Sequence, residues 1–136
     1  MKVHRFLNGG EDVIEKPILS LVVIRSQDIE RLAEFYSIIG LHFEKHRHGS
    51  GPDHFSYESG MSVFEIYPRQ GDDDSTTGAR LGFHVLSVDS VVEKLEGAGA
   101  RVISIPKDSP WGRRAVVEDP EGHRVELTES VEEIET

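Results

Sequence analysis

Hydrophobic and polar residues alternate along this chain in two different periods, and the order of these periods repeats. A dense apolar run at 18–25 predicts a buried strand, and apolar residues three and four apart from Ile29 to Ile39 predict a helix. Asp28 can cap this helix and Gly40 can end it. Three short strands are expected next, separated by glycine-containing turns, at 41–47, 54–58 and 62–67.

The same order follows a polar linker. Val91, Val92 and Leu95 indicate a second helix, which either Ser87 or Asp89 can cap. Strands are expected on both sides of it, at 81–88, 101–105, 113–118 and 124–128. The sequence therefore predicts a duplicated strand–helix–strand–strand–strand (βαβββ) module. The fold class is α+β, with two tandem modules that form paired curved mixed sheets around a cleft.

The expected organisation has five parts within one overall domain. They are an N-terminal arm at 1–17, a first βαβββ module at 18–69, a linker at 70–79, a second βαβββ module at 80–129 and an acidic tail at 130–136. Equivalent positions of the two modules keep a nearly constant spacing. Phe83 follows Leu21 by 62 residues, and Glu126 follows Glu65 by 61. This constancy supports a true internal repeat.

Composition narrows the function classes. The 136 residues contain no cysteine, which excludes disulfides and thiolate metal sites, and the formal net charge is −10 without a basic stripe for nucleic acid. No apolar run is long enough to span a membrane, and no secretory signal is visible. We therefore expect a cytoplasmic protein whose partners are neither nucleic acid nor membrane.

Each half of the chain contains motifs that resemble those of a known superfamily. In the first half they are Asp28, Phe35-Tyr36 and Gly40-Leu41. In the second half they are Pro110-Trp111-Gly112, Asp119-Pro120-Glu121-Gly122 and Val125-Glu126-Leu127. On these motifs the chain is similar to the vicinal oxygen chelate superfamily, which includes glyoxalases, bleomycin-resistance proteins and extradiol dioxygenases. The resemblance implies a cleft that binds a small molecule, often a divalent metal in it, and a homodimer.

The resemblance also implies a metal-ligand set. In the superfamily each module supplies one ligand from its first strand and one glutamate from its last strand. The two glutamates are present as Glu65 and Glu126, but the first-strand positions fall on Leu21 and Phe83, which cannot bind a metal. His84 is one residue from that position, and strand parity places its side chain on the opposite face.

Two interpretations of Glu65 and Glu126 remain open. They can act as metal ligands or as catalytic acid and base, or they can pair with arginines, for which Arg25, Arg114 and Arg124 are the candidates. The expected cofactor is accordingly none or one divalent metal ion, Mg²⁺, Mn²⁺, Zn²⁺ or Ni²⁺.

Aromatic and histidine side chains give further candidates. Trp111, Tyr67 and Tyr57 are large enough to line a cleft. We expect Trp111, Tyr67, Arg25, Arg124, Phe83 and Leu21 to contact the ligand. His46 and His48 share a strand face and His54 is on the next strand, so the three form either a metal site or an exposed titratable strand. His123 is expected to be exposed in a turn.

The sequence leaves two leading hypotheses for function. In the first, the protein binds a small organic molecule in the cleft between its modules, with an incomplete or absent metal site. In the second, it is a metal-dependent lyase or isomerase of the glyoxalase type, with Glu65 and Glu126 as ligands. Whether it is an enzyme is left open by the residues alone.

Overall fold

The first sheet and its helix come from the first half of the chain. The computed structural model describes residues 4–7, 11–14 and 16–129. The first module contains β3 (Leu21–Ser26), α1 (Ile29–Ile39), β4 (Glu44–His46), β5 (His54–Ser59) and β6 (Ser62–Pro68). The sheet has the order β3-β6-β5-β4, in which β3 and β6 are parallel and the other neighbours antiparallel.

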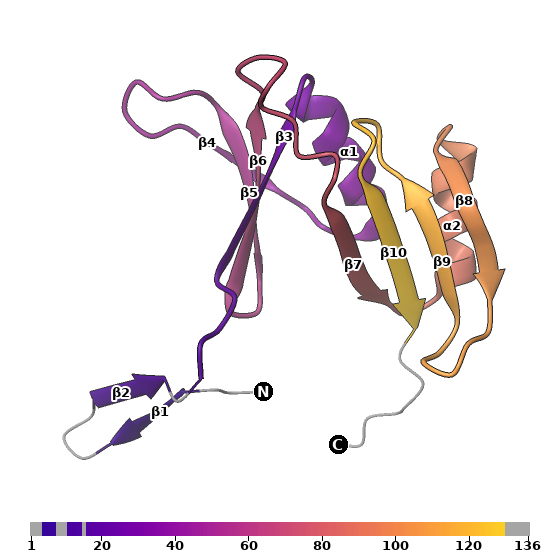
Figure 1. Cartoon of the computed structure of the whole chain (residues 1–136), viewed down its shortest axis with the longest axis horizontal. Coiled ribbons are helices and arrows are strands. Elements are labelled where there is room, and N and C mark those ends of the chain that lie inside the picture. Colours follow the sequence, from indigo (N-terminus) through magenta and orange to yellow (C-terminus); the bar gives the residue numbers. More distant parts are fainter. Residues whose placement is uncertain (1–3, 8–10, 15, 130–136) are drawn as a thin grey trace.

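The second module repeats this arrangement, as Figure 1 shows. It contains β7 (Arg80–Val85), α2 (Val88–Gly97), β8 (Arg101–Lys107), β9 (Arg114–Glu118) and β10 (Arg124–Glu129). The sheet order is β7-β10-β9-β8, in which β7 and β10 are parallel and the other neighbours antiparallel. The predicted α+β fold of two βαβββ modules is confirmed.

Two further strands precede the first module. They are β1 (His4–Leu7) and β2 (Glu11–Ile14), and they pair antiparallel as a separate two-stranded sheet. The sequence pattern predicted only an arm at 1–17 and did not indicate these strands. The predicted acidic tail at 130–136 lies outside the described residues. In the described part of the chain, no helix is both long and apolar enough to cross a membrane.

Local capping residues set the bounds of both helices. The carboxylate of Asp28 accepts a hydrogen bond from the backbone nitrogen of Arg31 at 3.1 Å, and Gly40 ends α1 with φ +123°. The hydroxyl of Ser87 accepts one from the backbone nitrogen of Ser90, also at 3.1 Å. Ser87, rather than Asp89, is therefore the cap of α2.

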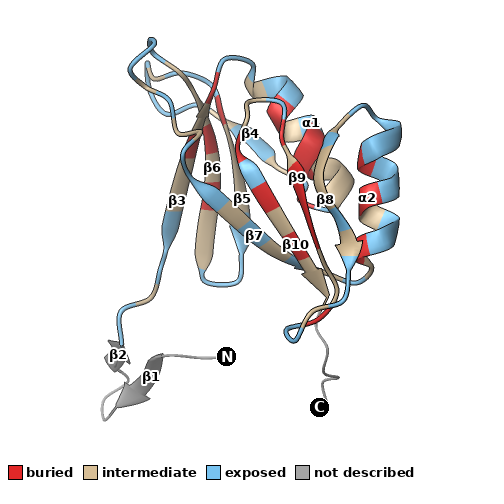
Figure 2. Ribbon diagram, turned by 45° about the vertical axis from the view of Figure 1, so that its right-hand side comes forward, coloured by how far each residue is buried: buried red, intermediate tan, exposed pale blue. Residues whose placement is uncertain are grey.

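The two modules share one hydrophobic core. Each helix covers one face of its own sheet, and the two helices contact each other (Figure 1). Tyr36 of α1 packs against Phe64 of β6 at 5.4 Å between ring centres and against Phe83 of β7 at 5.9 Å. Buried residues gather on these helix-covered faces in Figure 2. The opposite face of each sheet, which no helix covers, is called its open face below.

Candidate functional site

The open face of the first sheet brings together four of the predicted site residues. Leu21 and Arg25 alternate along β3, and Glu65 and Tyr67 lie on the neighbouring strand β6, where Arg25 is directly opposite Tyr67. Leu21 is 53% exposed, whereas residues 22 and 24 face the helix. The predicted parity of these strands was correct, because the apolar side of each strand packs under α1.

Arg25 and Glu65 both have partners on or beside this face. The guanidinium of Arg25 lies 5.4 Å from the centre of the Tyr67 ring and 3.6 Å from the carboxylate of Asp74. Glu65 accepts a hydrogen bond from the hydroxyl of Ser56 at 2.7 Å. The surface therefore combines apolar area with oriented polar groups, as ligand sites do.

The open face of the second sheet carries Glu126 between arginines. The Nε atom of Arg114 donates to Glu126 at 2.6 Å, and the Nε atom of Arg80 lies 3.7 Å from its other oxygen. The bond from Arg114 is the main reason that the pKa of the Glu126 carboxyl is lowered, against a smaller opposing effect of burial. Glu126 is held as an ion-paired carboxylate, and Arg124 is exposed on the same strand face.

The structure corrects the predicted orientation of the first strand of the second module. Phe83 faces the core, where its ring lies 5.9 Å from that of Phe64. His84 is exposed on the face of Glu126, and its Nδ1 lies 2.8 Å from the hydroxyl of Thr128 on β10. The predicted parity of β7 was therefore wrong by one residue, which exchanges its two faces.

Phe83 and His84 both line a pocket between the modules. This pocket has a volume of about 750 Å³. It lies beside the end of α1, the start of α2 and strand β7. Tyr57, a predicted cleft aromatic, also lines it and packs 5.8 Å from Phe43, on the helix-covered side of the first sheet. The rings of Tyr57 and Phe83 therefore do not lie on an open face.

The expected cleft between Glu65 and Glu126 is not formed within one chain. Each glutamate lies on the open face of its own sheet, and the helix-covered faces turn toward the shared core. Side chains of the core fill the space between the modules, where the ring of Phe83 packs against those of Tyr36 and Phe64. The open faces consequently turn away from that core, because both sheets bury their other face in it (Figure 1).

The donor set does not fit the divalent metal that the superfamily resemblance implies. Leu21 offers no donor atom, Glu65 and Glu126 lie on separate faces, and Glu126 is already neutralised by Arg114 and Arg80. A cation beside two guanidinium groups would be repelled. Among the residues that the structure describes, no three histidine, aspartate or glutamate side chains are arranged to hold a metal ion. We derive no metal-dependent step at this position.

Trp111 lies in the loop between β8 and β9. Its side chain is 77% exposed, and the hydroxyl of Ser109 accepts a hydrogen bond from its backbone nitrogen at 3.1 Å. Leu86, after β7, is fully exposed, and Ile105 on β8 is also exposed. All three side chains belong to the second module, and Trp111 is the only one of them that was predicted to contact a ligand.

A buried polar network joins the two modules, and the sequence did not reveal it. The hydroxyl of Tyr36 donates to Asp119 at 2.7 Å, and Nδ1 of His123 lies 2.9 Å from the same carboxylate oxygen. Nε2 of His123 lies 2.7 Å from the hydroxyl of Thr76 in the linker. His123 was predicted to be exposed in a turn, but it is fully buried, because these partners converge on it.

The network also sets the ionisation of its members. Burial acts to raise the pKa of Asp119, but the hydrogen bonds from His123 and Tyr36 outweigh it and lower this pKa. Burial, together with the charge of Asp119, raises the pKa of the Tyr36 hydroxyl well above its usual value. The junction therefore contains an ionised carboxylate and a neutral phenol.

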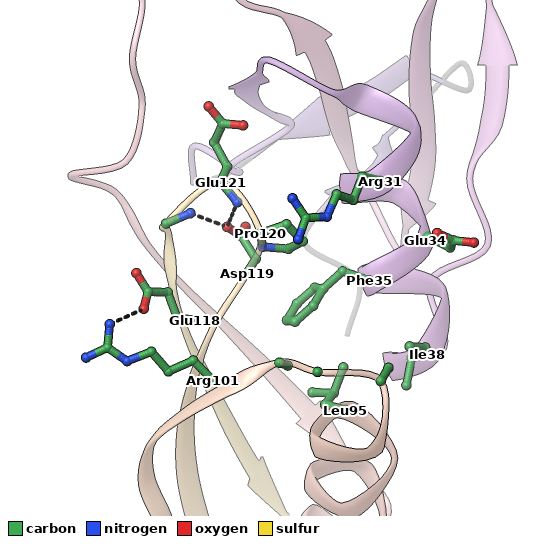
Figure 3. Close-up of a pocket in the computed structure, with 14 residues that line it drawn as sticks. Arg31, Glu34, Phe35, Ile38, Leu95, Arg101, Glu118, Asp119, Pro120 and Glu121 are labelled. Atoms are coloured by element: carbon green, nitrogen blue, oxygen red, sulfur yellow. Dashed lines mark hydrogen bonds and ion pairs between the residues drawn. The ribbon is translucent and has the colours of Figure 1, made fainter.

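A pocket of about 740 Å³ lies on the helix layer and shares Glu118 at its rim with the second open face (Figure 3). It is bounded by α1, the end of α2 and the turn between β9 and β10, with Phe35, Ile38 and Leu95 as apolar lining. Arg101 at its rim is paired with Glu118 at 3.1 Å. None of the predicted site residues lines this pocket. Its position on the helix layer makes it a separate feature of the fold.

Comparison with known proteins identifies the family. The sequence profile of the Glyoxalase/Bleomycin resistance protein/Dioxygenase superfamily matches residues 18–127, which is most of the chain. The chain belongs to this superfamily. No curated protein sequence matches it significantly.

Solved structures agree with this assignment at the level of the fold. TnmS3, an antibiotic binding protein from Streptomyces sp. CB03234, is 20% identical with a TM-score of 0.67, over 87% of this chain and 99% of that one. A family enzyme from Burkholderia phytofirmans PsJN is 23% identical with a TM-score of 0.66, over 82% and 98%. TioX from Micromonospora sp. ML1 is 21% identical with a TM-score of 0.60, over 85% and 100%.

Proposed function

We propose that this superfamily member binds a small organic molecule on its open faces without a metal ion. The observation that carries the proposal is the open face of the first sheet. Leu21, Arg25, Glu65 and Tyr67 lie side by side there with no element of the described chain covering them. The similarity to an antibiotic binding protein supports the same class of ligand.

We further propose that the site is completed in a homodimer. The open face of the first sheet carries more carboxylates than guanidinium groups, with Glu44, Glu58 and Glu65 beside Arg25. That of the second sheet carries Arg80, Arg114 and Arg124 beside Glu118 and Glu126. Opposite charges attract, so the first sheet of one copy fits the second sheet of its partner. The ligand then lies between Tyr67 and Glu65 of one copy and Trp111 of the other.

The roles within this site follow from the side chains. Tyr67 and Trp111 supply flat apolar area for an aromatic or cyclic ligand. Glu65 can accept hydrogen bonds from a cationic or hydroxylated ligand, and it retains the position expected of an acid–base residue. Arg25 is oriented by Tyr67 and Asp74 and can bind an anionic group of the ligand.

The rival hypothesis is a metal-dependent lyase of the glyoxalase type. One observation favours it, because His84 shares the face of Glu126. Two observations disfavour the lyase hypothesis. His84 is already paired with Thr128, and arginines surround Glu126. Binding without catalysis agrees better with the chemistry of these donors. The cytoplasmic location expected from the sequence remains a prediction.

The experiment combines assembly and binding. Sedimentation of the purified chain is expected to show a dimer. A panel of antibiotics that includes bleomycin is then screened for a thermal shift, and the ligand that binds is mapped by amide chemical shifts. We expect changes on β3 and β6, and at least tenfold weaker binding for Glu65→Gln, whereas Glu93→Gln on the exposed side of α2 serves as the control. Changes confined to the pocket of Figure 3 would refute the proposed site.

A further inference from the structure

Three histidines share a small volume at the β4 edge of the first open face. His46 and His54 are directly opposite in the antiparallel ladder of β4 and β5, and His48 follows two residues after His46. The three ring centres lie 6.2 Å (His46 and His48), 6.0 Å (His46 and His54) and 5.1 Å (His48 and His54) apart. Side chains in opposite ladder positions are near neighbours, which explains the contact.

The Nε2 atom of His54 is placed as it would be in a metal-binding histidine. The residue is 1% exposed, and its Nδ1 atom lies 3.4 Å from the carbonyl oxygen of Pro52. A proton on Nδ1, assigned from this contact, leaves a lone pair on Nε2. Nε2 is buried and has no hydrogen-bond partner among the described residues. A metal-binding histidine shows the same arrangement, in which the second ring nitrogen is held by a backbone carbonyl.

The spacing of the rings is close to that of a metal site. An imidazole bound to Zn²⁺ at about 2.0–2.1 Å has its ring centre about 3 Å from the ion, so ring centres in a tetrahedral site are roughly 5 Å apart. The three rings do not converge in the arrangement seen. A metal site here requires the side chains of His46 and His48 to rotate toward Nε2 of His54, and both side chains are solvent-accessible. His54 is held by stacking on Tyr67, with ring centres 4.2 Å apart.

The surroundings of the cluster suit a cation. The carboxylate of Glu44 lies 3.5 Å from Nε2 of His46 and can orient this ring or supply a fourth ligand. A pocket of about 510 Å³ beside the cluster is lined by Glu44, His46, His48 and Glu58, so two of the three histidines border open space with two carboxylates. Imidazole ligands select Zn²⁺, Ni²⁺ or Cu²⁺ over Mg²⁺ and Ca²⁺.

We propose that His46, His48 and His54 form a binding site for one transition-metal ion such as Zn²⁺. The site lies on β4, β5 and the turn between them. It uses neither Glu65 nor Glu126, on which the superfamily resemblance places its metal. The site shares the open face of the first sheet with the ligand site proposed above, since Tyr67 and Glu44 border both. Its own ligands are three histidines that the ligand site does not use, so the Zn²⁺ measurement below tests it separately.

The test measures Zn²⁺ binding by the full chain without a histidine tag, in competition with a chromophoric chelator at neutral pH. One equivalent is expected to bind, and Co²⁺ is expected to give the visible absorption of a tetrahedral site. His46→Ala and His48→Ala should each weaken binding at least tenfold. His84→Ala is the matched control, because it removes a histidine from the open face of the other sheet.

Several results would overturn the proposal. One is the absence of saturable Zn²⁺ binding. Another is Zn²⁺ binding by the His46→Ala and His48→Ala variants that is as tight as that of the wild type, and a third is loss of Zn²⁺ binding on Glu65→Gln. The last result would place the ion at the position expected from the superfamily. Substitution of the buried His54 can affect folding, so the two accessible histidines decide the test.

Discussion

The substitution Tyr36→Phe tests the buried junction between the modules. It removes one hydroxyl group, which donates to Asp119 at 2.7 Å, and keeps the ring that packs against Phe64 and Phe83. Asp119 retains His123 and three backbone nitrogens as donors after the change. The variant therefore isolates a single hydrogen bond that joins α1 to the turn between β9 and β10.

The magnitude follows from the charge of the acceptor. A hydrogen bond to an ionised group contributes about 1.5–3 kcal/mol to the free energy of unfolding. Both ends of this bond are buried, with Tyr36 fully and Asp119 almost fully inaccessible to water, so solvent cannot replace it. In a chain of 136 residues, this loss corresponds to a decrease in Tm of roughly 5–12 °C.

The loss should depend on pH. The pKa of Asp119 is lowered in the folded state, so its stabilising contribution is complete above the usual pKa of about 3.9 and disappears as the pH falls through the folded-state value. Tyr36→Phe removes one of the bonds that lower this pKa. The difference in stability between the variant and the wild type should accordingly be largest near neutral pH and become smaller as the pH falls below about 3.9.

Urea unfolding at equal protein concentration, at neutral pH and at about pH 3, measures both quantities. Tyr57→Phe is the control, because its hydroxyl has no hydrogen bond within the described residues and its ring is half-buried on the same side of the first sheet. We expect the control to change stability by less than about 0.5 kcal/mol. A loss for Tyr36→Phe that is equally small, or identical at the two pH values, would refute the role assigned to ionised Asp119.

Other predictions concern the surface and the backbone. Arg114→Gln should raise the pKa of Glu126 toward the usual range of a glutamate, as measured by carboxyl NMR titration, and an unchanged pKa would contradict the ion pair. Trp111→Ala should change the stability of the unliganded monomer by less than about 0.5 kcal/mol in urea unfolding and still weaken ligand binding. Gly97→Ala should stabilise α2 by about 0.5–1 kcal/mol, whereas Gly99→Ala should destabilise it by about 1–2 kcal/mol, because Gly99 has φ +94°. Equal thermal shifts for the two glycine variants would contradict this.

Local signals account for what the sequence predicted well. Asp28 and Gly40 lie within a few residues of the helix ends that they set, and the apolar stripe of α1 is read from residues three and four apart. The strands near Glu65 and Glu126 alternate with a period of two, so their open faces followed from parity. Such signals need no knowledge of how the two modules meet.

The buried network could not be predicted in this way. Tyr36 and Asp119 are 83 residues apart in the sequence, and Thr76 and His123 are 47 apart. A histidine after Asp-Pro-Glu-Gly looks like an exposed turn residue, because turns are polar and lie on the surface. Its burial results from packing between α1, the linker and the second sheet, which local periodicity does not encode. The sequence did group His46, His48 and His54, but it did not predict that His54 is buried, because that burial depends on stacking against Tyr67.

The orientation of β7 shows how one capping residue changes the interpretation of the site. Leu21 precedes the cap of α1 by seven residues, and the residue seven before Ser87, the cap of α2, is Arg80. The sheet registers agree, because Leu21 is opposite the residue two before Glu65, and Arg80 is opposite the residue two before Glu126. Arg80, not Phe83, therefore occupies the first-strand position of the second module.

This assignment bears directly on the chemistry of the site. At a position where the resemblance expects a metal ligand, the second module has a guanidinium group, 3.7 Å from Glu126. Together with Arg114 at 2.6 Å, it supplies the positive charge that a metal ion would otherwise bring to this carboxylate. The arginines thus explain how Glu126 can be kept without a metal, and Leu21 supplies apolar surface at the matching position of the first module. Both substitutions favour a site that binds a molecule over one that binds a divalent ion.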